Sequence, residues 1–226
     1  MADLRAAHTQ KVVELWCEDE ARLGLKPVAR RAWALRGARP TSNGRHRFAS
    51  VQVFGFAHPA TGRNRLWLHP KADAGRMGEA LAAFARWADP DGAKVLVVVI
   101  DKAGYHTAKK LAVPANVRLH FLPSCTPELQ PAERLWPVLR EAVANRVFDD
   151  LPTLSAAITT RGQWMADHPE VVGGVVGFHW AVAARQERIN RTWYDRAVSL
   201  TRRVGIPVGV NVAFDLSAGA KPKALW

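Results

Sequence analysis

The sequence predicts a mixed α/β fold built on a five-stranded sheet, and three observations support this prediction. Residues 95–100 form an unbroken apolar run of strand length, typical of a strand covered on both faces near the centre of a parallel sheet. Residues 12–18 and 45–56 alternate apolar and polar side chains, as half-buried strands do. Residues 74–88 place apolar side chains at helical spacing. The expected order is β-β-β-α-β-α-β-α, with the helices flanking the sheet.

The first strand carries a cluster of acidic residues at its end. Alternation divides residues 13–20 between two faces, with Val13, Leu15, Cys17 and Asp19 on one face and Glu14, Glu18 and Glu20 on the other. Asp19 therefore continues the apolar face, and we expect it to point where the sheet packs. Residues 45–56 and 64–69 flank a Pro-Ala-Thr-Gly turn and are expected to pair as a hairpin.

Helices and strands are expected to alternate in the middle of the chain. The helix predicted at residues 74–88 has a core stripe of Met77, Leu81, Phe84 and Trp87. A second helix is expected near Thr107 to Ala112. Residues 117–122 then form a strand that Pro123 ends.

The next helix is expected to begin near Pro131, because proline is favoured at the first helical position. This start places Glu133 in the first turn. Pro137 has no amide hydrogen to bond back to the carbonyl of Glu133, so the helix should kink or restart there.

Residues 1–150 are expected to form one domain, and residues 151–226 a helical, basic extension whose tail is flexible. Helices are predicted at residues 151–165 and 180–200. A solvated basic face is favoured over DNA contact for the arginines in and after the second helix, which are Arg185, Arg188, Arg191, Arg196, Arg202 and Arg203. No motif is found beyond residue 205.

Composition favours a folded protein with a polyanionic partner. The chain has 226 residues, of which 48% are hydrophobic, and a formal net charge of +12. Nucleic acid is the leading partner, since no apolar run approaches the roughly 20 residues that span a bilayer. The amino-terminal residues lack the apolar core of a signal peptide, so we expect a soluble, cytoplasmic protein associated with the nucleoid. Cys17 and Cys125 form neither a disulfide framework nor a zinc motif.

Asp101 follows the central apolar strand directly. In open α/β sheets ligands bind beyond the carboxyl ends of the strands, so a carboxylate there is placed for chemistry. A turn or helix-cap aspartate is the structural alternative when this segment is taken alone.

Three groups of residues occur in a characteristic order. The first is Asp19-Glu20-Ala-Arg-Leu-Gly followed by Arg31-Ala-Trp33-Ala-Leu-Arg-Gly37. The second is Asp101 with His106, and the third is Leu122-Pro-Ser-Cys-Thr-Pro-Glu-Leu-Gln-Pro-Ala-Glu133-Arg-Leu-Trp136. Together they resemble the DDE transposases of the Tc/mariner superfamily, in particular its bacterial insertion-sequence branch. The 31 residues between Asp101 and Glu133 are close to the family's usual spacing.

The resemblance covers about residues 12–150 and implies an RNase H-like catalytic domain with an acidic triad of Asp19, Asp101 and Glu133. It further implies that the triad binds two Mg²⁺ or Mn²⁺ ions, for which carboxylates are suitable ligands. His106 is a candidate accessory residue, although a single histidine near a helix start is more often structural. Two positions depart from the family's pattern, since Lys102 and Gln130 stand where the family usually has asparagine.

Basic residues crowd the segment that follows Asp19. Phosphate contact is favoured there over a solvated basic hairpin because of the adjacent carboxylate. The predicted DNA-binding residues are Arg22, Lys26, Arg30, Arg31, Arg36 and Lys102.

The resemblance makes a transposase catalytic subunit or fragment the leading hypothesis for the function, with DNA ends and target DNA as partners. Asp19 lies so close to Met1 that we expect no amino-terminal helix-turn-helix domain, and a homodimer or a separate helix-turn-helix subunit would supply end recognition. Three alternatives stay open: an inactive, domesticated DNA-binding protein, a generic RNase H-like nuclease, and, least favoured, a phosphohydrolase with a strand-terminal aspartate. Strand joining would distinguish the transposase from the nuclease.

Overall fold

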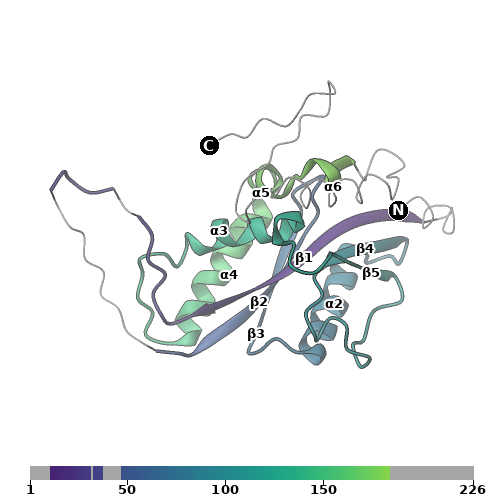
Figure 1. Cartoon of the computed structure of the whole chain (residues 1–226), viewed down its shortest axis with the longest axis horizontal. Helices are drawn as coiled ribbons and strands as arrows, with labels where there is room; N and C mark the ends of the chain where they lie inside the picture. The colour runs from purple at the N-terminus through teal and green to yellow at the C-terminus, as the bar shows by residue number, and fades with distance from the viewer. Residues whose placement is uncertain (1–10, 32, 38–46, 184–226) are drawn as a thin grey trace, which may run out of the picture. The chain divides into compact units, whose positions relative to one another are not determined.

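Five strands form one mixed sheet in the computed structural model, which describes residues 11–31, 33–37 and 47–183 (Figure 1). The strand order is β3-β2-β1-β4-β5. The strands are β1 (Val12–Gly24), β2 (Ser50–Ala57), β3 (Asn64–His69), β4 (Lys94–Ile100) and β5 (Val117–Phe121). The helices are α2 (Ala74–Ala88), α3 (Leu135–Arg140), α4 (Leu151–Asp167), α5 (Pro169–Val176) and α6 (His179–Ala183), with 3-10 helices η1 (Pro127–Leu129) and η2 (Pro131–Arg134).

The central strand β1 pairs differently along its two edges. It is antiparallel to β2, with Asp19 opposite Gly55, and parallel to β4, with Cys17 opposite Val99. Continuing the parallel register by two residues places Asp19 beside Asp101, just beyond the end of β4. The first and fourth strands are therefore neighbours, as the RNase H-like plan requires.

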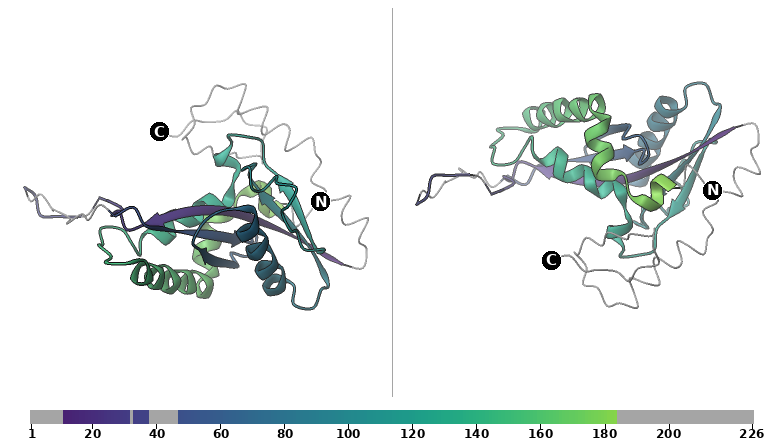
Figure 2. Two further views of the ribbon diagram at one scale, coloured as in Figure 1. Left: turned by 90° about the horizontal axis from the view of Figure 1, so that it is seen from below. Right: turned by 90° about the horizontal axis from the view of Figure 1, so that it is seen from above.

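Helix α2 covers one face of the sheet (Figures 1 and 2). Its apolar stripe packs on Trp16, Phe54 and Phe56, and the rings of Phe56 and Phe84 stack with centroids 4.3 Å apart. Asp73 begins the helix, because its carboxylate accepts a hydrogen bond from the amide of Arg76 (2.9 Å). The core stripe predicted from the sequence is confirmed, with Trp87 partly buried at its edge.

The opposite face of the sheet is covered by η2, α3 and α4. The side-chain amide of Asn64 on β3 donates to the carbonyl of Met165 on α4 (2.8 Å). Gly162 of α4 lies against the side chain of Leu66, so a Cβ at this position would lie only 3.1 Å from Leu66 Cδ1. The hydrogen bond and the close contact together hold α4 on β3.

The helix expected near Thr107 to Ala112 is absent, and this prediction was wrong. The chain turns there instead, with the amides of His106 and Leu111 donating to the carbonyls of Ala103 (2.9 Å) and Ala108 (2.9 Å). A six-residue helix gains few bonds for its nucleation cost. Pro114 also disfavours helical geometry at the residue before it.

The helix expected from Pro131 is present in two parts. It begins as the 3-10 helix η2, and the α-helix restarts at Leu135, so Pro137 lies in the first turn of α3. No donor is required there, which explains why the proline is tolerated. Helix α4 confirms the prediction at residues 151–165, whereas most of the predicted 180–200 helix lies outside the described residues.

Beyond β1 the chain leaves the sheet as an arm, whose described parts are residues 25–31, 33–37 and 47–49 (Figure 1). The base of the arm is held by Asn145, whose amide donates to the carbonyl of Val28 (2.9 Å) and whose side chain bonds the backbone of Arg30. No helix in the described part of the chain is long and apolar enough to cross a membrane.

We expect Phe84→Ala to destabilise the fold by about 3–5 kcal/mol, because the cavity would open in the aromatic cluster that joins α2 to the sheet. The measurement is urea-induced unfolding followed by circular dichroism. Arg86→Ala, an exposed change on the same helix, is the control and should cost less than about 0.5 kcal/mol. Equal losses for the two variants would contradict this account of the core.

Candidate active site

A pocket of about 330 Å³ lies beyond the carboxyl ends of β4 and β5, beside Asp19 in the middle of β1. Asp19, Asp101 and Glu133 all line it, together with Lys102, Gln130 and residues 122–127. Three carboxylates far apart in the sequence thus meet at the edge of the sheet where ligands of α/β folds bind.

Asp19 is held by a hydrogen bond from helix α3. The indole Nε1 of Trp136 donates to Asp19 Oδ2 at 2.6 Å. Burial raises the pKa of Asp19 from 3.8 to about 7; the Trp136 bond lowers it, and the charges of Glu133 and Glu20 raise it. Asp19 therefore lies in a negative, poorly solvated environment.

Gly55 makes room for this hydrogen bond. It faces Asp19 across the β1–β2 pair, and a Cβ at this position would lie 2.7 Å from the ring of Trp136. Any larger residue would push the indole away from Asp19. The resemblance identified neither Gly55 nor the bond, although it included Trp136 in the third motif.

Glu133 is positioned through Gln130. The buried Gln130 side chain donates to the carbonyl of Glu18 on β1 (2.8 Å), and its Oε1 accepts from the amide of Ala132 (3.4 Å). Gln130 therefore begins η2 and ties it to β1 beside Asp19. Glu133 lies in η2 with its side chain exposed.

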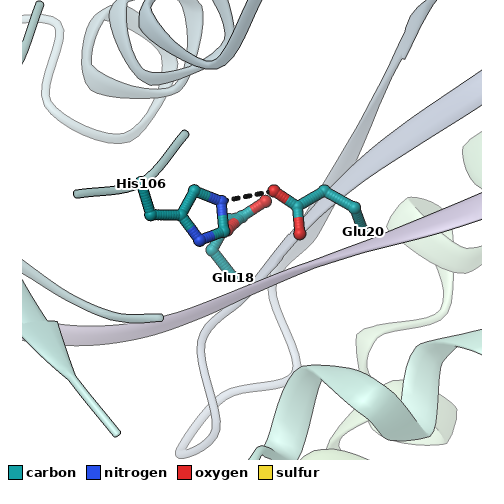
Figure 3. Close-up of side chains that lie close together, drawn as sticks. All are labelled: Glu18, Glu20 and His106. Carbon is teal, nitrogen blue, oxygen red and sulfur yellow. Dashed lines mark hydrogen bonds and ion pairs between the residues drawn. The ribbon is translucent and has the colours of Figure 1, made fainter. Parts of the chain in front are cut away.

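Asp101 and Glu20 are joined by a single histidine. Asp101 Oδ1 accepts from the amide of Ala103 (2.8 Å) and lies 2.7 Å from His106 Nδ1. His106 Nε2 lies 2.6 Å from Glu20 Oε1 (Figure 3). Burial alone would lower the pKa of His106, but the hydrogen bonds and charges of Glu20 and Asp101 outweigh burial and raise it. Without a bound cation, the two carboxylates therefore favour the protonated form of the ring.

The burial of Glu18 is not predicted by the sequence pattern. Its side chain is fully buried, and neither carboxylate oxygen has a hydrogen-bond partner among the described residues. Burial and the charges of Glu20, Asp19 and Asp101 raise its pKa well above the ordinary value. Trp16, two residues earlier on the same face, is a signal that this face is also covered.

The residues of the pocket fit divalent cations. Burial first, and then the charges of Glu133 and Glu20, raise the pKa of Asp19, and a bound cation would stabilise its ionised form. Oxygen ligands suit Mg²⁺ and Mn²⁺. The tightest group of acidic and imidazole side chains in the described residues is a different one, formed by Glu18, Glu20 and His106.

The predicted DNA-binding residues are all exposed, and one of them lines the pocket. Lys102 is exposed and lines the pocket itself. The others follow the end of β1 and the arm, and all are exposed: Arg22, Lys26, Arg30, Arg31 and Arg36. The Nε of Arg22 donates to Ser50 Oγ (2.8 Å), which fixes the guanidinium beside the β1–β2 pair.

Comparison with known proteins identifies the family. A family model described as DDE superfamily endonuclease matches residues 14–155. The chain belongs to this family. This match confirms that residues 14–155 form a DDE family domain, as the resemblance found in the sequence implies.

Individual relatives support the family and the fold. An uncharacterized protein of Sinorhizobium fredii (strain NBRC 101917 / NGR234), named y4pE/y4sA, is 34% identical over 130 residues, covering 57% of this chain and 95% of that protein. The mariner Mos1 paired end complex with Mg matches with a TM-score of 0.51 and 16% identity, covering 78% of this chain and 57% of that one. This match confirms the RNase H-like fold. The protein described here spans somewhat more than half of the Mos1 chain.

We expect the metal-free Asp19→Asn variant to become more stable relative to the wild type as the pH rises from about 4 to about 7. The pKa of Asp19 is raised on folding, so folding binds a proton and wild-type stability falls as the pH rises through this window. Above about pH 7 the difference should stay constant. Urea unfolding in a chelator at several pH values measures this difference. Asp91→Asn, in the exposed turn before β4, should follow the wild-type curve.

Trp136→Phe keeps an aromatic ring but removes the donor to Asp19, so the pKa of Asp19 should rise further. We expect the affinity for Mn²⁺ at neutral pH to fall about 10- to 100-fold. Isothermal titration calorimetry gives the affinity. Trp164→Phe on α4, whose ring stacks on His168, is the control. Unchanged binding in Trp136→Phe would show that the indole bond does not organise the site.

Proposed function

We propose that this chain is the catalytic part of a DNA transposase that mobilises an insertion sequence. The observation that supports this most strongly is that Asp19, Asp101 and Glu133 line one pocket beyond the carboxyl end of β4 in a DDE family chain. The reaction is metal-dependent hydrolysis of a phosphodiester bond, in which water attacks phosphorus and the 3′-oxygen leaves. The freed 3′-hydroxyl then attacks a phosphodiester of the target DNA, and the target's own 3′-oxygen leaves.

In this proposal Asp19, Asp101 and Glu133 would hold two Mg²⁺ or Mn²⁺ ions. The ions, when bound, activate the attacking oxygen and stabilise the charge on the phosphate and on the leaving oxygen. The Trp136 indole keeps Asp19 oriented, while the Ala103 amide and His106 orient Asp101.

The exposed basic residues would contact the phosphates of the DNA backbone. Lys102 lies next to Asp101 and would contact the phosphate that reacts, and the exposed residues of the arm would contact phosphates further along the strand. Such contacts carry little sequence information. Reading of the element ends needs base contacts, which a homodimer or a helix-turn-helix subunit would supply.

The test incubates the full chain with supercoiled plasmid and Mn²⁺ and separates nicked, linear and joined products by electrophoresis. Asp101→Asn should lower product formation at least about 100-fold, since losing a metal ligand costs more than losing an outer partner. Glu128→Gln, an exposed carboxylate in η1 beside the pocket, is the matched control and should stay active.

Each product pattern has one interpretation. Joined products that need Asp101 support the transposase, and cleavage without joining supports a nuclease of the same fold. Salt-sensitive plasmid binding with no product under Mg²⁺ or Mn²⁺ would overturn the enzymatic proposal and leave a DNA-binding protein.

A further inference from the structure

A second group of metal-binding side chains lies on the other face of β1 from Asp19. Glu18, Glu20 and His106 each offer one ligand atom, and these atoms all lie within 4.8 Å of one another. Figure 3 shows the imidazole ring of His106 next to both carboxylates, with Nε2 directed at Glu20 and Glu18 beside the ring. Two of these ligands come from one strand and the third from the loop after β4.

Glu18 is a buried carboxylate that needs a neutralising partner. The side chain is 0% exposed, and neither of its oxygens has a hydrogen-bond partner in the described part of the chain. Its antiparallel neighbour is Phe56, in the aromatic core under α2. A buried carboxylate without donors is strongly disfavoured unless a cation or a proton neutralises it.

His106 is oriented as metal-binding histidines usually are. Such a histidine bonds the metal through one ring nitrogen and donates its other N–H to a carboxylate. The residue is 2% exposed, Nε2 lies within the cluster, and Nδ1 lies 2.7 Å from Asp101 Oδ1. An ion at Nε2 would therefore fix the tautomer that donates to Asp101.

We propose that Glu18, Glu20 and His106 bind one divalent transition-metal ion, of which Zn²⁺ is the best match, at a site separate from the Asp19–Asp101–Glu133 pocket. An imidazole ligand favours Zn²⁺ over Mg²⁺, whereas three carboxylates favour Mg²⁺ or Mn²⁺. The ion is structural: it neutralises Glu18 and holds the loop of His106, and hence Asp101, in place. This site does not depend on the proposed function, since ion binding is measured without DNA.

The experiment starts from the full chain carrying Asp19→Asn and Glu133→Gln, which weakens the carboxylate pocket and keeps all three residues of the new site. We expect this parent protein to retain about one Zn²⁺ per chain after dialysis against excess Mg²⁺. Adding Glu18→Gln should weaken Zn²⁺ binding at least about 100-fold, which exceeds the usual loss for an outer partner. The matched control is Glu14→Gln, on the same face of β1 but paired with Lys94, and it should bind like the parent.

Two further measurements distinguish loss of a metal-binding side chain from loss of the fold. Metal-free Glu18→Gln should unfold at the same or a higher urea concentration than its parent, because the amide removes a buried charge. When Cu²⁺ replaces Zn²⁺, the electron spin-echo spectrum of the parent should show coupling between the copper electron spin and an imidazole nitrogen. The spectrum of Glu18→Gln should lack this coupling.

A parent protein that binds no Zn²⁺ would overturn the proposal, and so would Zn²⁺ binding that Glu18→Gln leaves unchanged. Infrared spectroscopy tests the alternative that a proton neutralises Glu18. The proposal would also be overturned if the parent shows a band of a protonated carboxyl in excess Zn²⁺ and Glu18→Gln removes this band. None of these outcomes bears on plasmid cleavage by the wild type, so the two proposals fail independently.

Discussion

The parallel pairing of β1 with β4 is the constraint on which the site depends. It sets Asp19 level with Asp101, and the antiparallel pairing of β1 with β2 sets Gly55 beside Asp19. Because side chains alternate along a strand, the same register sends Glu18 and Glu20 to the face under α2. One strand thus supplies carboxylates to both faces of the sheet, and a slip of one residue would exchange the two sets.

Concentrating these charges is unfavourable, and the fold offsets the cost with a few well-placed donors. Trp136 donates to Asp19, and the amide of Ala103 and the ring of His106 bond Asp101. Each donor comes from a segment outside β1, so each bond also fixes the loop or helix that carries it. The same hydrogen bonds therefore stabilise the carboxylates and fix the surrounding segments. In this way the site is preorganised before substrate binds.

Local signals explain which parts of this arrangement the sequence predicts. The predicted boundaries of β3 and α2 agree with the structure because a Gly turn and an Asp cap define them. The helix expected near Thr107 failed because tertiary contacts of His106 and the neighbouring Pro114 outweigh a weak local preference. The Trp136–Asp19 bond joins residues 117 apart in sequence, so no local pattern reports it. The burial of Glu18 was missed because an acidic residue on an alternating strand is ordinarily solvent-facing.

The two residues that depart from the family pattern, Gln130 and Lys102, differ in their contacts. Gln130 is buried and makes two hydrogen bonds, one across to β1 and one to its own helix, so its longer side chain still reaches both partners from its own backbone position. Lys102 is exposed, and its side chain contributes charge to the pocket rather than a fixed contact. A change at position 130 therefore acts on the geometry of Glu133, whereas a change at position 102 acts on the attraction of an anionic substrate. The fold separates these two effects because the residues that hold the carboxylates point inward, while Glu133 and Lys102 remain open to solvent.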